Sequence, residues 1–173
     1  QNQGSIGVKL EDLKEYPKKT IFALCRWLDI KEIDSLYKMT AQGKKWWGDP
    51  SSPAYKDDGM DPFGKISTTR KLGIIFSKND QFILSTLFYP FNVRFNYVKE
   101  NLEQFKKDLQ IIRPMIDQIF DFEKIIAQNK NIEIKEFMES GSYRFLRSGM
   151  IERWNTLNKF HTYPNMLKLL KID

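Results

Sequence analysis

Residues 48–64 are the segment that most limits how this chain can fold. The segment contains three prolines and three glycines. Proline lacks a backbone N–H and glycine loses much conformational freedom on ordering, so no long helix or strand can pass through the segment. We therefore expect a long surface loop here, with regular structure on both sides of it.

The loop is acidic, and part of it resembles a calcium-binding loop. Asp57, Asp58 and Asp61 stand in the sequence DDGMD. The alternating ligands and the terminal glutamate of a calcium loop are missing, so we expect no calcium site. The three carboxylates would repel a phosphate backbone, and a DNA-binding surface must therefore exclude them.

A basic polar cluster and two short apolar runs follow the loop. The cluster extends from Lys65 to Lys71, and the runs are LGIIF at residues 72–76 and QFIL at residues 81–84. Two short apolar runs joined by a four-residue polar link predict a β-hairpin. A basic element followed by a hairpin is how a winged-helix DNA-binding unit ends, so the segment favours such a unit.

The segment before the loop has a helical pattern. Apolar residues recur at helical spacing between residues 10 and 37, and Pro17 can occupy the first turn of a helix. The predicted apolar face consists of Ile21, Leu24, Cys25 and Leu28. A second, shorter helix is expected over residues 30–37 and is ended by Gly43, while residues 1–9 are expected to be a loose arm.

Most of the chain after residue 97 also has helical periodicity. Pro114 divides the periodic segment 98–128, and it either kinks one helix or lies in the first turn of a second. Short helices are predicted over residues 134–138 and 165–171, with a longer one over 143–160. The apolar face of the longer helix consists of Tyr143, Leu146, Met150, Trp154 and Leu157. The arginines beside this face, which we expect to point outward, are Arg144, Arg147 and Arg153.

These patterns predict an α+β fold that is mainly helical, with winged-helix-like units and one or more β-hairpins. A chain of 173 residues is long enough to bury a stable core without cross-links. We expect an N-terminal winged-helix-like unit over residues 1–95, containing the long loop and the hairpin. A second helical unit over residues 96–173 would share the same core.

The charge of the chain indicates an acidic partner. The formal net charge is +6 and the isoelectric point is about 9.3. A basic surface suits nucleic acid, an anionic membrane surface or an acidic protein, although a lysine-rich composition can also serve solubility alone. No apolar run of 18 residues is present, so we expect no membrane span.

Composition also excludes several kinds of catalytic site. The chain has one cysteine, Cys25, and one histidine, His161. One of each rules out a disulfide framework, most zinc sites and the usual nucleophilic triads. Cys25 lies in an apolar helical pattern and is expected in the core, which suits a reducing, cytoplasmic location. We expect no cofactor.

The function that these residues favour is binding of double-stranded DNA. Lysine, arginine and hydroxyl side chains neutralise or hydrogen-bond phosphate oxygens, and a few side chains then contact base edges. The candidates for backbone contacts are Lys44, Lys45, Lys65, Thr68, Thr69, Arg70 and Lys71. The candidates for base or further phosphate contacts are Arg144, Arg147 and Arg153.

Three stretches resemble the DNA-recognition region of type IIS restriction and nicking endonucleases of the AlwI/MlyI kind. They are GKKWWG from residue 43, TRKLGIIFSKNDQFIL from residue 69, and the segment from Arg113 to Phe137. The resemblance implies winged-helix units that hold duplex DNA for a separate nuclease domain. The protein would then be a recognition domain of a restriction, modification or mobile-element protein, or a small regulator. The chain departs from the family in lacking an evident nuclease domain.

Two other functions remain open at this point. An aromatic surface that includes Trp46 and Trp47 could anchor a protein partner. A Mg²⁺-dependent nuclease could use the Glu-x-Lys sequence at Glu133 and Lys135 together with an upstream carboxylate. The upstream candidates are Asp117 and Asp121.

Overall fold

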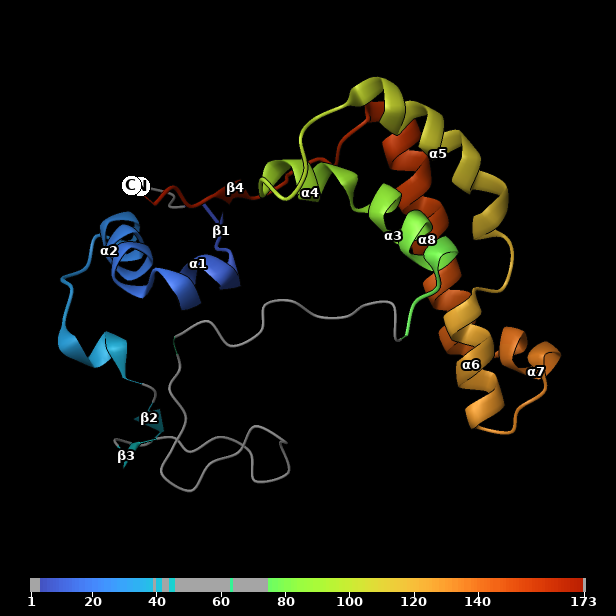
Figure 1. The fold of residues 1–173 in the computed structure, drawn as a ribbon, viewed down its shortest axis with the longest axis horizontal. Coiled ribbons are helices and arrows are strands. Elements are labelled where there is room, and N and C mark those ends of the chain that lie inside the picture. The colour runs from blue at the N-terminus through green and yellow to red at the C-terminus, as the bar shows by residue number, and fades with distance from the viewer. Residues whose placement is uncertain (1–3, 39, 42–43, 46–62, 64–74, 173) are drawn as a thin grey trace. The chain divides into compact units, whose positions relative to one another are not determined.

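The computed structural model describes residues 4–38, 40–41, 44–45, 63 and 75–172 (Figure 1). The chain divides into two compact units. Unit 1 lies within residues 1–70 and 167–173, and unit 2 lies within residues 71–166. The boundary predicted from the sequence was after residue 95, whereas the division into compact units falls after residue 70 and after residue 166.

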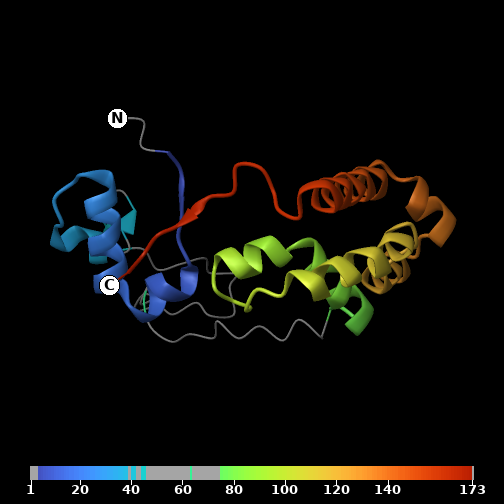
Figure 2. The same ribbon diagram turned by 90° about the horizontal axis from the view of Figure 1, so that it is seen from above.

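Unit 1 consists of short strands and helices from both ends of the sequence. Its elements are β1 (Ile6–Gly7), α1 (Leu10–Glu15), α2 (Pro17–Leu28), the 3₁₀ helix η1 (Asp34–Tyr37), β2 (Thr40–Ala41), β3 (Lys44–Lys45) and β4 (Lys168–Leu169). β1 pairs with β4 in parallel, and the two strands lie side by side in both views (Figures 1 and 2). β2 pairs with β3 in an antiparallel ladder.

The pairing of β1 with β4 corrects two predictions. The tail over residues 165–171 is not a helix, and residues 4–9 are not simply a loose arm. The N–H of Leu170 extends the ladder by donating to the carbonyl of Gly7 at 2.8 Å, and the Leu170 side chain is buried. A strand pair between segments 162 residues apart leaves no periodic signal in either segment, so only the fold reveals it.

The helix predicted at Pro17 is confirmed, and its first turn is tied to α1. Pro17 is at the first position of α2. The hydroxyl of Thr20 donates to the carbonyls of Asp12 and Tyr16, at 2.9 and 3.0 Å. Ile21 and Cys25 are buried as predicted, whereas Leu28, at the C-terminal end of the same face, is exposed.

Unit 2 is helical throughout its described elements. They are α3 (Lys78–Leu87), α4 (Tyr89–Arg94), α5 (Leu102–Ile116), α6 (Asp121–Asn129), α7 (Ile134–Glu139) and α8 (Gly141–Phe160). α3 and α8 both pack against α5 (Figure 1). The core consists of Ile83, Leu87, Phe105, Leu109, Ile112, Ile116, Phe120, Met150 and Leu157. The prediction of a mainly helical chain is confirmed.

The hairpin predicted over residues 72–84 is wrong in its second strand. Residues 81–84 lie inside α3, while residues 72–74 lie outside the described part of the chain. Ser77 and Asp80 form a capping box, in which the N–H of Asp80 donates to the Ser77 hydroxyl and the N–H of Ser77 donates to the Asp80 carboxylate. Residues 77–80, predicted as the turn of the hairpin, therefore begin a helix, because these two side chains satisfy N–H groups of its first turn.

Pro114 does not begin a second helix. It lies in the last turn of α5, which ends at Ile116. A proline removes only one hydrogen bond from a helix, and near the C-terminal end that loss interrupts little of the ladder. Among the described residues, no helix has the length and apolar character that a membrane crossing requires.

Candidate nucleic-acid interface

The strongest candidate site is a basic hollow on α2 in unit 1. Lys19, Arg26 and Lys171 line a hollow of about 440 Å³ together with three less polar residues. These residues are Phe22, Ala23 and Trp27. None of the described residues that line the hollow is acidic. We call this surface the basic face.

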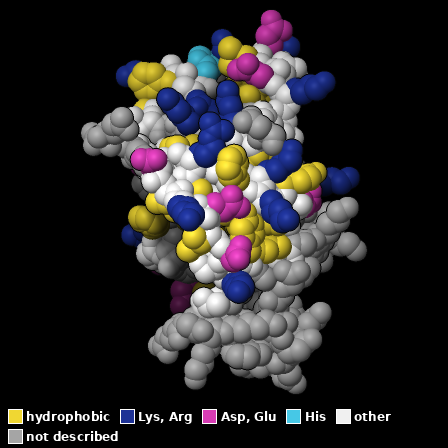
Figure 3. Space-filling model, turned by 90° about the vertical axis from the view of Figure 1, so that its left-hand side faces the viewer, with side chains coloured by type: hydrophobic (Ala, Val, Ile, Leu, Met, Phe, Trp, Pro, Cys, Tyr) yellow, Lys and Arg dark blue, Asp and Glu magenta, His cyan; other side chains and the backbone are white. Residues whose placement is uncertain are grey.

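Helical spacing brings most of the basic face together. Lys19, Phe22 and Arg26 are three and seven residues apart, so they lie on one side of α2, while Ile21 and Cys25 are buried. In the view of Figure 3, on the side where α2 lies, Lys and Arg side chains gather into a cluster. The Arg26 guanidinium carbon lies 5.9 Å from the Phe22 ring centroid, a cation–π contact that helps to orient the arginine.

Lys171 reaches the basic face from the far end of the sequence. It follows β4, whose pairing with β1 fixes the backbone two residues earlier. Leu170, which directly precedes Lys171, is buried and anchors the chain further. A sequence pattern on α2 could have found Lys19 and Arg26, but Lys171 becomes a neighbour only through the β1–β4 ladder.

The cations of the basic face form no ion pairs with the described carboxylates. The ion pairs among the described residues are Lys9–Asp12, Arg113–Asp117, Lys124–Asp121 and Arg147–Glu123. Lys19, Arg26 and Lys171 belong to none of them and are exposed. Three converging cations that lack a counterion among the described residues create a local positive potential that favours an anionic ligand.

Several of the predicted phosphate contacts lie outside the described residues. These are Lys65, Thr68, Thr69, Arg70 and Lys71. The tryptophans Trp46 and Trp47 and the aspartates of the acidic loop also lie outside the described residues. Lys44 and Lys45 form β3, which pairs with β2, so the backbone of both residues belongs to unit 1.

Arg144 and Arg153 are exposed on α8, but the prediction that Arg147 points outward is wrong. Arg147 is only 7% exposed. Its Nη1 donates to the carbonyl of Ile116 and its Nη2 to Oε2 of Glu123, both at 2.6 Å. Its guanidinium carbon also lies 4.2 Å from the Phe120 ring centroid. This side chain joins α8 to the end of α5 and the start of α6, and it is not available to a phosphate.

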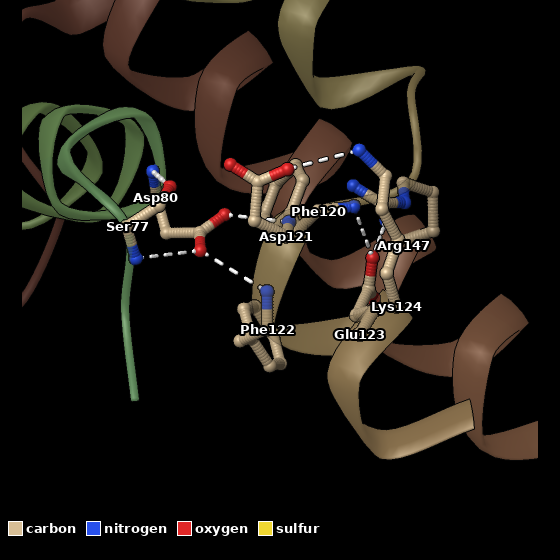
Figure 4. Close-up of polar contacts among 8 residues, drawn as sticks. All are labelled: Ser77, Asp80, Phe120, Asp121, Phe122, Glu123, Lys124 and Arg147. Atoms are coloured by element: carbon tan, nitrogen blue, oxygen red, sulfur yellow. Dashed lines mark hydrogen bonds and ion pairs between the residues drawn. The ribbon is translucent and has the colours of Figure 1, made fainter. Parts of the chain in front are cut away.

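Two buried carboxylates complete this junction (Figure 4). Asp80 accepts hydrogen bonds from the N–H groups of Ser77, Asp121 and Phe122, at 3.0, 3.0 and 3.1 Å. Oε2 of Glu123 accepts the N–H of Phe120 at 2.8 Å in addition to Arg147. The first-turn N–H groups of two helices are thereby satisfied, so both carboxylates stabilise the fold.

The two upstream carboxylates proposed for a nuclease are each paired with a cation. Asp117 pairs with Arg113 at 2.7 Å, and Asp121 pairs with Lys124 at 2.9 Å. The hydrogen bond from Lys124 is the largest cause that holds the pKa of Asp121 below its ordinary value.

Glu133 and Lys135 lie at the start of α7. A nuclease of this type requires these two residues on a strand. Among the described residues, no three acidic, histidine or cysteine side chains are placed to hold a metal ion.

The comparisons with known proteins give no family for the chain. No family model matches the sequence. No curated protein and no solved structure matches it either. The resemblance to type IIS restriction endonucleases therefore stays a prediction, and the function has to be argued from the geometry of the chain itself.

Proposed function

We propose that unit 1 binds double-stranded DNA through the basic face of α2. The observation that carries the proposal is the convergence of Lys19, Arg26 and Lys171, which form no ion pair in the part of the chain that the structure describes. Cations of this kind release counterions from DNA when they contact phosphates, and this release supplies most of the sequence-independent affinity.

The spacing along α2 suits successive phosphates of a duplex. Lys19 and Arg26 are seven residues apart, which is about 10 Å along the helix axis. One strand of B-DNA rises about 3.4 Å per nucleotide, so the two cations span about three phosphate steps. Lys171 adds a third contact from outside the helix. Phe22 keeps the Arg26 guanidinium in place beside the hollow.

The finer expectations belong to the same proposal. Lys44 and Lys45 and the cluster from Lys65 to Lys71 would extend the contact to the phosphate backbone. Arg144 would be a further contact, whereas the Arg153 guanidinium lies against Phe88 and Tyr163 and is left out of the DNA interface. That the chain is a winged-helix recognition domain of a restriction or mobile-element protein rests on the sequence resemblance alone.

A binding titration against a random duplex tests the proposal. We expect the triple variant Lys19→Ala, Arg26→Ala and Lys171→Ala to bind at least about tenfold more weakly at low salt. The slope of log affinity against log salt concentration should also become less steep by about 2.7, at about 0.9 for each phosphate contact. Fluorescence anisotropy of labelled DNA over a salt series measures both quantities.

A matched control separates the basic face from net charge. Lys106, Lys107 and Lys130 are exposed in unit 2 and belong to no ion pair among the described residues. Their triple alanine variant removes the same charge, and we expect it to change the affinity by less than about threefold. Equal losses in both triple variants would show that net charge, and not the basic face, determines binding.

A further inference from the structure

Unit 2 has an apolar groove beside α8. The groove has a volume of about 710 Å³ and is lined by residues of α3, α4 and α8 and of the segment after α8. Phe88 and Leu146 on its walls are both partly exposed. Phe145 also lines it and is 83% exposed, more than any other large hydrophobic residue among those described. An exposed aromatic ring beside an open apolar groove is a feature of an association surface.

One end of the groove has a fixed cation. The Arg153 guanidinium carbon lies 5.2 Å from the Phe88 ring centroid and 5.5 Å from that of Tyr163. The Tyr163 hydroxyl donates to the carbonyl of Leu87, which holds this ring against α3. The groove therefore ends in an ordered aromatic and cationic wall. A further aromatic ring can pack against that wall.

We propose that the occupant of this groove is a second copy of the chain, related by a two-fold axis that passes beside Gly149. Phe145 is four residues before Gly149 and Arg153 is four residues after it. An antiparallel pair of α8 helices centred on Gly149 places Phe145 opposite the partner's Arg153, and the reverse contact forms by symmetry. Each contact then lies about 6 Å along the helix from the axis.

Gly149 permits the close approach that this packing needs. A Cβ built at Gly149 meets no atom within 4 Å, so the helix surface is open at this point. Glycine adds no side chain there, and the backbones of two helices can approach each other more closely than at a larger residue. Along α8, the projecting Phe145 ring and the Arg153 guanidinium lie on opposite sides of Gly149, and both line the groove.

The groove is less suited to a charged peptide. Its lining contains one anion, Glu152, and one cation, Arg153, so neither an acidic nor a basic peptide gains a net attraction. A second copy supplies an aromatic ring for the cation, because the negative face of the partner's Phe145 can lie on the guanidinium of Arg153. A projecting ring and a hollow on one surface are what an isologous interface requires.

Sedimentation velocity of the full chain at micromolar concentration tests the proposal. We expect a dimer for the native chain and at least about a tenfold increase in its dissociation constant for Phe145→Glu, because a central aromatic anchor carries much of such an interface. Phe145 is exposed, so the variant should keep the native circular dichroism spectrum. Ile111 on α5 is also exposed and lies outside the groove, and Ile111→Glu should remain dimeric. A monomeric native chain, or equal behaviour of the two variants, would overturn the proposal.

Cross-linking tests the register of the two helices. A residue beside a two-fold axis meets its own copy, and a disulfide requires Cα atoms within about 7 Å. Gly149→Cys should therefore form a covalent dimer under mild oxidation. Thr156→Cys, seven residues from the axis on the same groove, should not. The native chain with its buried Cys25 is the control for background oxidation. Preferential cross-linking of Thr156→Cys would rule out an axis at Gly149.

Discussion

Arg26 on α2 and Arg147 on α8 are both arginines within amphipathic helices, and the fold gives them opposite environments. Arg26 is exposed on α2, and its guanidinium lies over the face of Phe22. Arg147 is buried on α8, paired with Glu123 and bonded to the carbonyl of Ile116. The difference comes from the neighbouring helices, because the junction of α5 and α6 supplies Arg147 with the buried Glu123 carboxylate and the Ile116 carbonyl.

The largest expected effect is on stability and belongs to Arg147. Arg147→Ala leaves the Glu123 carboxylate buried without its cation, and we expect a loss of about 3–5 kcal/mol in the free energy of unfolding. Arg26→Ala should change it by less than about 0.5 kcal/mol, as is usual for an exposed side chain. Urea denaturation followed by circular dichroism measures both.

A double variant sharpens this prediction. If the cost of Arg147→Ala comes from the unpaired carboxylate, Arg147→Met together with Glu123→Gln should recover part of the lost stability. No recovery would mean that the hydrogen bond to Ile116 and the contact with Phe120 carry the stabilisation.

The next effect concerns Asp80, which caps two helices. Asp80→Ala removes the acceptor of three backbone N–H groups, two of them in α6. Hydrogen bonds to a charged group contribute about 1.5–3 kcal/mol, so we expect a loss of about 2–4 kcal/mol in the free energy of unfolding. Asp80→Asn keeps an acceptor oxygen and should lose less. An equal loss in both variants would indicate that the charge, and not the acceptor geometry, stabilises the junction.

A smaller effect, on the salt dependence of DNA binding, distinguishes Arg26 from Arg147. Arg26→Ala alone should reduce the steepness of the salt dependence of DNA binding by about 0.9, the contribution of one phosphate contact. A substitution of Arg147 that leaves the protein folded, such as the double variant above, should leave this slope unchanged. Anisotropy titrations at several salt concentrations decide between the two, and a shallower slope in the Arg147 variant would contradict the assignment of the interface to unit 1.

The smallest effect is pH-dependent and concerns Asp121. Its pKa in the folded protein lies below the ordinary value, chiefly because of the hydrogen bond from Lys124. The ionised form is therefore stabilised by folding, and this contribution is present above the ordinary pKa of about 3.9 and is lost as the pH falls through the folded value.

The variant Asp121→Asn should be slightly less stable than the native protein at pH 7. The difference should disappear once the pH falls below the folded-state pKa of Asp121, which lies under its ordinary value. Melting temperatures at a series of pH values give the measurement. The effect is small because both side chains are about two-fifths exposed. A difference that persists unchanged at the lowest pH would mean that the charge of Asp121 does not contribute.

Local sequence signals could predict most of the helices. Pro17 and the spacing of Ile21 and Cys25 were sufficient for α2, and the long apolar face was sufficient for α8, which begins two residues earlier than predicted. The error at α3 arose because two apolar runs of four or five residues fit a strand as well as a helix. The Ser77-x-x-Asp80 pattern was the signal that could have distinguished them.

Features that depend on distant partners could not be predicted in the same way. The burial of Arg147 depends on Glu123, which lies on another helix and 24 residues earlier. The basic face depends on Lys171, which reaches α2 only because β4 pairs with β1. In both cases the sequence shows a charged residue near an apolar face, and only the fold decides whether its partner is a carboxylate or the solvent.

The pairing of β1 with β4 also gives the chain a nested organisation. Unit 1 is discontinuous in sequence, and unit 2 is inserted between its two parts as one continuous segment. An inserted unit can be excised without cutting its own contacts, so residues 75–166 are the natural choice for independent expression. Unit 1 has the opposite property, because removal of residues 167–172 unpairs β1 and takes Lys171 away from α2. Residues 167–172 therefore contribute both to the folding of unit 1 and to the charge of its surface.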